Sequence, residues 1–333
     1  MIQNNKFYIK KIENIVFFGF SKIFSELQKI NKSLNIKDLI ITSSDQKKEF
    51  SSENNVYVFD KLDTKFKKFI SKKGNISKTI FISFGCRWIF KKKDINFFQN
   101  NLLNFHGTRL PYDAGGGGFS WNILRNDRIN NQIVHLIEPA IDTGSILMHT
   151  KSLFPSYCKI PKDFEDYRNH QLKIFYEKFI KQLINGKSFY LQKQLNYMGR
   201  YNPRLSTEIS GWINWNISSQ ELFKFINAFD DPYPGARTIY KGKTVIIKKV
   251  HIHGGESPNH PFMSGLVSRH DGDWIVVSTI DENMLLVESI TDLKGKNLFH
   301  EIKPGDRFYT PTSKLDLAIA KKISYTTKGR KIV

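Results

Sequence analysis

The first half of the chain alternates short, continuously apolar runs with lysine-rich polar stretches. Four runs, at residues 14–20 (NIVFFGF), 39–42 (LIIT), 56–59 (VYVF) and 79–83 (TIFIS), are rich in β-branched and aromatic side chains. Parallel strands covered by helices on both faces are apolar throughout rather than alternating. The pattern therefore predicts an α/β fold with a mostly parallel sheet, to which residues 133–136 (IVHL) add a further strand.

A long helix and then a change of pattern follow these strands. Residues 163–186 carry apolar side chains at helical spacing, which predicts a helix that faces the core and ends near Gly186. From about residue 211 onward, short apolar runs lie between glycines and prolines, which is typical of a small barrel or sandwich. The apolar stripe of the helix comprises Leu172, Phe175, Tyr176, Phe179, Ile180 and Leu183.

The length of 333 residues fits about two domains. We expect the first domain to span residues 1–208 and the strand-rich second domain to span residues 209–312. Residues 313–333 are rich in lysine and are interpreted as a basic tail that frays.

The composition is strongly basic, with 51 lysines and arginines against 31 aspartates and glutamates, a formal net charge of +20. A polyanionic partner such as nucleic acid would explain this excess. Because the lysines are scattered and form few blocks, we favour a generally basic surface. Under either interpretation, a basic cleft would suit a small phosphate-bearing substrate.

Other features indicate where the protein acts. The chain has no run of about 18 apolar residues, and its first residues lack the apolar stretch of a signal peptide, so we expect no membrane contact. Cys86 and Cys158 lack the spacing of metal ligands and are expected to be reduced thiols. Together these features predict a cytoplasmic protein.

A candidate site lies where the next strand of the sheet is expected to end, at Asn104-Phe105-His106. In an extended segment, Asn104 and His106 share one face while Phe105 turns into the core. An imidazole can move protons near neutral pH, and an amide can donate a hydrogen bond to a carbonyl oxygen that becomes an oxyanion. Asp142 follows the strand at residues 133–136 and could orient the histidine. Because ligands bind beyond the carboxyl ends of parallel strands, we expect these side chains to meet there.

Four consecutive glycines, residues 115–118, follow this motif. Glycine lets a backbone approach a ligand closely, although such a run is also typical of a flexible loop. The first turn of the sheet, FFGFSK, lacks the glycine pattern of dinucleotide-binding folds, so a nicotinamide dinucleotide has no support there. Asn-x-His and Asp-x-Gly are each common in structural roles. The interpretation as a site therefore depends on their order together with the glycine loop.

In this order, the motif NFHGTRLP (residues 104–111), the glycine loop and IDTG (residues 141–144) resemble the formyltransferases that use 10-formyltetrahydrofolate. The resemblance implies that Asn104, His106 and Asp142 are the catalytic trio, that 10-formyltetrahydrofolate is the formyl donor, and that no metal is required.

The second half of the chain resembles the same family. AFDDPYPGA (residues 228–236) and GDRFYTP (residues 305–311) resemble the OB-like C-terminal domain of formyltransferases that act on methionyl-tRNA or amino sugars. The resemblance thus covers about residues 14–312. It implies a Rossmann-like formyltransferase domain followed by a small all-β OB-like domain.

The resemblance also implies ligand contacts. SFGCRWI (residues 83–89) matches the strand-end loop that receives the pterin ring in this family. Two departures, GTR at residues 107–109 where a serine is usual and YDAG at residues 112–115 where Tyr-Arg-Gly is common, concern the acceptor side more than the chemistry. The expected folate contacts are Phe84, Gly85, Cys86, Trp88, Ile89 and Ile141, and the expected acceptor contacts are Arg87, Tyr112, Gly116, Gly117 and Trp121.

The family includes several acceptors. The enzyme that formylates methionyl-tRNA is expected to carry a basic insertion after the second strand, whereas residues 42–55 (TSSDQKKEFSSENN) are short and contain three acids beside two lysines. Residues 201–215 resemble the segment that joins the two domains in sugar N-formyltransferases. The resemblance therefore implies formylation of the amine of a nucleotide-linked amino-dideoxy sugar, such as dTDP-4-amino-4,6-dideoxyglucose, for surface polysaccharide (O-antigen) synthesis.

Three alternatives stay open at this point: a methionyl-tRNA formyltransferase, a non-catalytic OB-type nucleic-acid-binding protein, and a folate hydrolase that releases formate. The favoured hypothesis implies folate and a nucleotide-diphosphate amino sugar as partners, with no nucleic acid and no membrane. It also implies a homodimer, the usual state of similar proteins.

Overall fold

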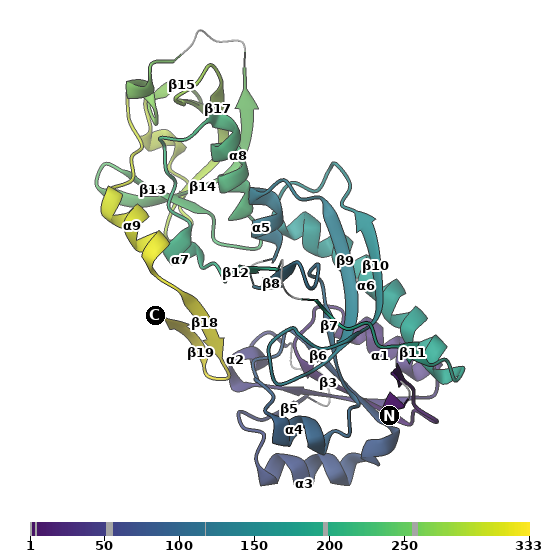
Figure 1. Cartoon of the computed structure of the whole chain (residues 1–333). Coiled ribbons are helices and arrows are strands. Elements are labelled where there is room, and N and C mark those ends of the chain that lie inside the picture. The colour runs from purple at the N-terminus through teal and green to yellow at the C-terminus, as the bar shows by residue number, and fades with distance from the viewer. Residues whose placement is uncertain (1, 4, 51–55, 117, 196–198, 255–258) are drawn as a thin grey trace.

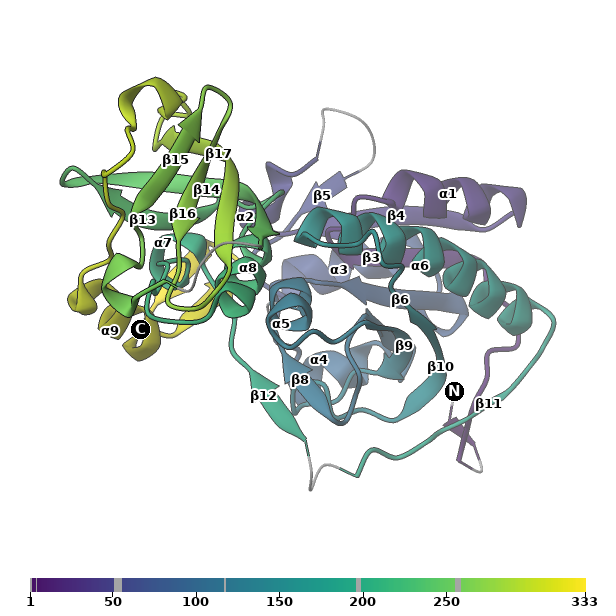
Figure 2. The ribbon, with the colours of Figure 1, turned by 90° about the horizontal axis from the view of Figure 1, so that it is seen from above.

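The computed structural model describes residues 2–3, 5–50, 56–116, 118–195, 199–254 and 259–333. The chain forms two lobes, one built around a large mixed sheet and one rich in antiparallel strands (Figures 1 and 2). No helix in these described ranges combines the length and the hydropathy that a bilayer crossing requires.

The first lobe contains a seven-stranded sheet in the order β10-β9-β7-β6-β3-β4-β5. The five strands that the apolar runs and the Asn104–His106 motif predicted are parallel, as expected. These strands are β3 (Asn14–Gly19), β4 (Lys37–Thr42), β5 (Val56–Val58), β6 (Thr79–Phe84) and β7 (Leu102–His106).

The last two strands correct the expectation that residues 133–136 continue the parallel part of the sheet. Both β9 (Ile129–Leu136) and β10 (Ile146–Leu153) are antiparallel to their neighbours. Leu136 pairs with Leu103, near the start of β7, and not at the end of that strand. The loop between β9 and β10 must therefore fold back toward the end of β7 to bring Asp142 to His106.

Helices cover both faces of the sheet. Alternate residues of each buried strand point to opposite sides, so an apolar strand presents apolar side chains on both faces. Phe17 packs in the cluster that contains α1 (Phe24–Ser33) and α6 (Pro161–Ile184). Phe18 packs in the cluster with α3 (Thr64–Lys73) and α4 (Lys92–Phe97). The apolar stripe predicted on α6 faces the core, and Gly186 follows the helix with a φ of +75°.

The second lobe holds a five-stranded antiparallel sheet, in the order β13-β14-β17-β16-β15, against which α8 (Ser219–Ala228) packs. Its hydrophobic cluster continues into the first lobe through Phe154 and Phe164, whose ring centroids lie 4.4 Å apart. This shared core joins the two lobes. The strands are β13 (Ala236–Tyr240), β14 (Lys243–His253), β15 (Val267–Asp271), β16 (Trp274–Ser278) and β17 (Met284–Asp292).

The C-terminal residues are folded, so the expectation of a fraying tail is wrong. After α9 (Thr312–Ala320), the chain forms a hairpin of β18 (Ile323–Thr326) and β19 (Gly329–Ile332). The hairpin returns to the first lobe and lies beside α2 (Ser44–Lys47), as the yellow ribbon shows in Figure 1.

Small elements complete the fold. Two of them, β8 and β12, pair in parallel and tie the glycine loop to the segment between the lobes. The small elements are β1 (Ile2–Gln3), β2 (Lys6–Phe7), β8 (Asp113–Gly115), α5 (Gly118–Leu124), β11 (Phe189–Tyr190), β12 (Arg200–Asn202) and α7 (Thr207–Ser210).

Candidate active site

The end of β7 places two polar side chains on one face of the sheet. Between them, Phe105 is 5% exposed and packs against α6, with its ring centroid 5.7 Å from that of Tyr176. Because side chains alternate along a strand, Asn104 and His106 point away from α6. Both are half-buried, so each is accessible to a ligand.

His106 is paired with Asp142. Nδ1 of His106 lies 3.5 Å from Oδ1 of Asp142 and 3.3 Å from Oγ1 of Thr108. Burial alone would raise the pKa of Asp142, but His106 and the backbone N–H of Gly115 outweigh it, and the pKa of Asp142 lies below its usual range. Asp142 is therefore ionised at neutral pH and holds His106 through Nδ1. Nε2 is left as the ring nitrogen that can exchange a proton with a ligand.

A second histidine, His135 on β9, holds Asn104. His135 is 2% exposed, and its Nδ1 lies 2.7 Å from the carbonyl oxygen of Leu136. Since a carbonyl oxygen can only accept a hydrogen bond, Nδ1 of His135 carries the proton. Nε2 is then unprotonated and accepts a hydrogen bond from Nδ2 of Asn104 at 3.1 Å. Burial and the neighbouring His106 lower the pKa of His135 to about 4, so the ring stays neutral at physiological pH. This contact fixes which way the Asn104 amide points.

His135 was missed in the sequence, where it is one letter of the apolar run IVHL. The available signal was a single polar residue inside a buried strand. Its functional meaning depends on the register between β7 and β9, which pairs Asn104 with His135.

The ligand atoms of His106, His135 and Asp142 lie within 4.8 Å of one another, close enough to hold a metal ion. However, both ring nitrogens of His135 are hydrogen-bonded, and Asp142 is engaged by His106. A metal would have to displace Asn104 from His135. The arrangement is better suited to binding and polarising a carbonyl group, with an amide donor beside an imidazole.

Two glycines are required by close approaches at this site. A Cβ on Gly144 would lie 1.8 Å from the carbonyl oxygen of Leu136, so the loop that carries Asp142 can close only with glycine there. Gly115 has a φ of +100°, and a Cβ on it would lie 2.2 Å from the carbonyl oxygen of Asn202.

Asp113, just before the glycine loop, explains the departure from the family pattern at residues 112–115. Asp113 is 5% exposed and forms ion pairs with three arginines, so it anchors the glycine loop to neighbouring segments. The distances to its carboxylate are 3.2 Å from Arg109, 3.6 Å from Arg125 and 2.6 Å from Arg200.

The residues expected to contact folate divide by burial. The side chains of Phe84 and Trp88 are in the core. The ring centroid of Phe84 lies 5.2 Å from that of Phe105, and the ring centroid of Trp88 lies 5.9 Å from that of Phe18. These two residues could therefore offer a ligand only their backbone. Ile89 and Ile141 are 67% and 66% exposed, which leaves apolar surface for a ligand. The carbonyl oxygen of Gly85 accepts a hydrogen bond from Gln46, and the free thiol of Cys86 accepts one from Oγ of Ser83.

The residues expected to contact the acceptor come from separate segments of the chain. Tyr112 is 54% exposed, and Nε1 of Trp121 donates to the carbonyl oxygen of Pro203 at 2.8 Å. Nε of Arg87 lies 3.1 Å from a carboxylate oxygen of Asp45. Gly116 packs directly on the side chain of Arg204, and Gly117 lies outside the described residues.

Comparison with known proteins gives consistent relatives. Residues 206–301 match the formyl transferase, C-terminal domain family. Methionyl-tRNA formyltransferase of Clostridium perfringens is 24% identical over 257 residues, which cover 76% of this chain and 80% of that protein.

Among solved structures, WlaRD, a sugar 3N-formyl transferase in the presence of dTDP and 5-N-formyl-THF, aligns with a TM-score of 0.60 and 21% identity over 83% of this chain and 97% of its own. The N-formyltransferase from Helicobacter canadensis, in complex with folinic acid and dTDP-3-aminofucose, aligns with a TM-score of 0.61 and 18% identity over 83% and 99%. Residues 206–301 therefore match the C-terminal domain of formyltransferases in sequence, and the chain is similar in fold to a sugar N-formyltransferase over 83% of its length.

Proposed function

We propose that this protein transfers the formyl group of 10-formyltetrahydrofolate to the amine of a nucleotide-linked amino sugar. One observation carries the proposal: Asn104, held by His135, lies next to the His106–Asp142 pair. An oriented amide donor beside an imidazole is what acyl transfer to an amine requires.

The residues have distinct roles in the proposed reaction. The neutral amine of the acceptor forms a bond to the formyl carbon, and Asn104 Nδ2 donates to the carbonyl oxygen as it becomes anionic. His106, oriented by ionised Asp142, moves the proton lost by the amine to the folate nitrogen while the bond between that nitrogen and the formyl carbon breaks. The products are the formamide and tetrahydrofolate. His135 touches no reacting atom and acts by fixing Asn104.

The folate would lie against the loop that follows β6. Exposed Ile89 and Ile141 suit a flat, largely apolar ring. The folate complexes of the similar formyltransferases support a folate as the formyl donor.

Two observations favour a sugar acceptor. The structural relatives include sugar N-formyltransferases bound to dTDP or a dTDP-amino sugar. The segment after β4, where the tRNA enzyme is expected to carry a basic insertion, forms α2 and is contacted by the C-terminal hairpin. A product destined for surface polysaccharide is part of this proposal.

Methionyl-tRNA formyltransferase is the second candidate, because the curated relatives that align over most of the chain have that function. A competition experiment separates the two. The protein would receive 10-formyltetrahydrofolate together with methionyl-tRNA and dTDP-linked 3-amino and 4-amino dideoxy sugars, and mass spectrometry would identify the formylated product. We expect one added formyl group on a sugar. Formylated methionyl-tRNA with unmodified sugars would establish the second candidate.

A further inference from the structure

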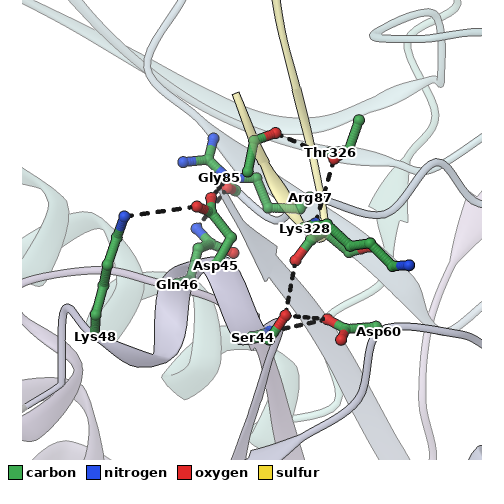
Figure 3. Close-up of polar contacts among 11 residues, drawn as sticks. Ser44, Asp45, Gln46, Lys48, Asp60, Gly85, Arg87, Thr326 and Lys328 are labelled. Atoms are coloured by element: carbon green, nitrogen blue, oxygen red, sulfur yellow. Dashed lines mark hydrogen bonds and ion pairs between the residues drawn. The ribbon is translucent and has the colours of Figure 1, made fainter. Parts of the chain in front are cut away.

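The C-terminal hairpin bridges the two lobes beside the candidate site. In the first lobe, the backbone N–H of Asp45 and Oγ of Ser44 both donate to the carbonyl oxygen of Thr327, each at 3.2 Å. Figure 3 shows Ser44 and Asp45 close to Thr326 and Lys328 of the hairpin. At the start of the second lobe, Arg330 forms an ion pair with Glu208. The hairpin is therefore held at two separate points and has a defined position.

One residue of this hairpin, Tyr325, lies against two guanidinium groups. The ring centroid of Tyr325 is 4.4 Å from Cζ of Arg87 and 5.4 Å from Cζ of Arg204. Arg204 also forms an antiparallel backbone bridge with Ile323, so the hairpin and the segment between the lobes are joined directly. Three segments far apart in the sequence thus meet here.

The positive charge of this cluster is not balanced. Arg87 is paired with Asp45. Within the part of the chain that the structure describes, Arg204 has no carboxylate within ion-pair distance and no side-chain hydrogen bond, and it is solvent-exposed. Burial of part of its side chain and repulsion from Arg87 lower the pKa of Arg204. An anion placed between the two arginines would relieve this repulsion.

Arg204 also adjoins the candidate catalytic residues. A Cβ on Gly116 would lie 2.2 Å from Cγ of Arg204, so the arginine rests directly on the glycine loop. Asp142 is near enough to raise the pKa of Arg204, although Asp142 itself is engaged by His106. A ligand whose amine reaches His106 would therefore have its neighbouring groups close to Arg204.

We propose that Arg204, Arg87 and Tyr325 form the binding site for the diphosphate of the acceptor. This inference rests on the proposed function, because it assumes an amino-sugar nucleotide as the acceptor and assigns the diphosphate of that acceptor to the cluster beside the hairpin. A planar guanidinium binds phosphate oxygens in bidentate fashion, and stacking on a tyrosine ring orients it before the ligand arrives. The Tyr325 hydroxyl adds a further donor.

The glutamate carboxylates of the folate share this anionic chemistry, so the test must distinguish the two sources. Isothermal titration calorimetry would measure the binding of dTDP, inorganic pyrophosphate and 5-formyltetrahydrofolate to the full-length protein. The variants are Arg204→Gln, Arg204→Lys and Tyr325→Leu. Arg307→Gln is the matched control, because Arg307 lies 4.8 Å from the ring of Phe262 in the second lobe, away from the site. Circular dichroism and thermal unfolding would check that each variant is folded.

We expect Arg204→Gln to weaken dTDP and pyrophosphate binding about tenfold or more, since a hydrogen bond to a charged group is lost. Arg204→Lys should restore part of that affinity, Tyr325→Leu should weaken it several-fold, and Arg307→Gln should match the parent protein. Binding of 5-formyltetrahydrofolate should change less than twofold throughout.

The opposite results overturn the inference. Weaker folate binding with unchanged dTDP binding would assign the cluster to the folate glutamate. Unchanged affinity for dTDP and pyrophosphate in Arg204→Gln would exclude an anion site, while leaving the proposed function intact. A parent protein that binds folate but neither dTDP nor pyrophosphate would contradict both the anion site and the proposed acceptor class.

Discussion

Nδ2 of Asn104 lies 3.1 Å from Nε2 of His135, and this contact orients the amide that the proposed reaction uses. The contact exists because His135 is neutral and has its proton on Nδ1, which donates to the carbonyl oxygen of Leu136. A buried histidine on β9 therefore determines where a side chain on β7 places its hydrogen-bond donor.

Removal of the amide should affect the chemical step directly. We expect Asn104→Ala to lower kcat about 100- to 1000-fold, the usual effect of losing an oriented oxyanion donor. The KM for the acceptor should change little, because the donor acts mainly in the transition state. Steady-state kinetics on the folded variant would measure both constants, and a nearly unchanged kcat would remove Asn104 from the mechanism.

Loss of His135 should act through Asn104. His135→Leu removes the acceptor at Nε2 while it keeps an apolar side chain in the buried position, and we expect kcat to fall about tenfold or more. In the double variant with Asn104→Ala, the His135 substitution should cost little further activity. Fully additive losses would show that His135 acts independently of Asn104.

The same histidine predicts a pH dependence of stability. Because the pKa of His135 is lowered from 6.5 to about 4, the unfolded chain binds a proton in this range that the folded protein does not. Its neutral form therefore supports full stability above about pH 6.5, and the free energy of unfolding should fall by about 3 kcal/mol as the pH drops to 4. Denaturant titrations should show a weaker pH dependence in His135→Leu. Equal slopes in both proteins would contradict the prediction.

Gly144 should be required for activity. Gly144→Ala would place Cβ 1.8 Å from the carbonyl oxygen of Leu136, so the loop must shift and carry Asp142 away from His106. We expect at least a 100-fold loss of kcat in a protein that still folds. Gly186→Ala is the control, because its positive φ is strained by a side chain but nothing lies within 4 Å of the added Cβ. Similar activity in the two variants would show that the tight approach at Gly144 is not needed.

Asp113 should stabilise the glycine loop. Asp113→Asn removes the buried charge shared by Arg109, Arg125 and Arg200, and we expect a loss of about 3 kcal/mol of stability. The KM for the acceptor should rise as the loop loosens, while the KM for the folate stays close to that of the parent protein. A variant with the stability of the parent would mean that the three arginines are satisfied without this carboxylate.

Local patterns in the sequence were enough to predict the parallel part of the sheet, because β3, β4 and β6 each contain a continuous apolar run that packs under helices. The alternation at residues 104–106 likewise predicted that Asn104 and His106 share one face. The direction of β9 could not be predicted, since a strand buried on both faces reads the same whether its neighbour is parallel or antiparallel. The C-terminal hairpin was also missed, because long-range contacts such as Thr327 with α2 hold it in place.

The most direct test of the account is the stoichiometry of a single reaction mixture that contains the protein, 10-formyltetrahydrofolate and a dTDP-amino sugar. We expect tetrahydrofolate and formylated sugar in equal amounts, no formate, and no turnover when the sugar is left out. The His106→Ala variant should form neither product at a comparable rate. Release of formate and tetrahydrofolate without any acceptor would contradict formyl transfer and indicate a folate hydrolase instead.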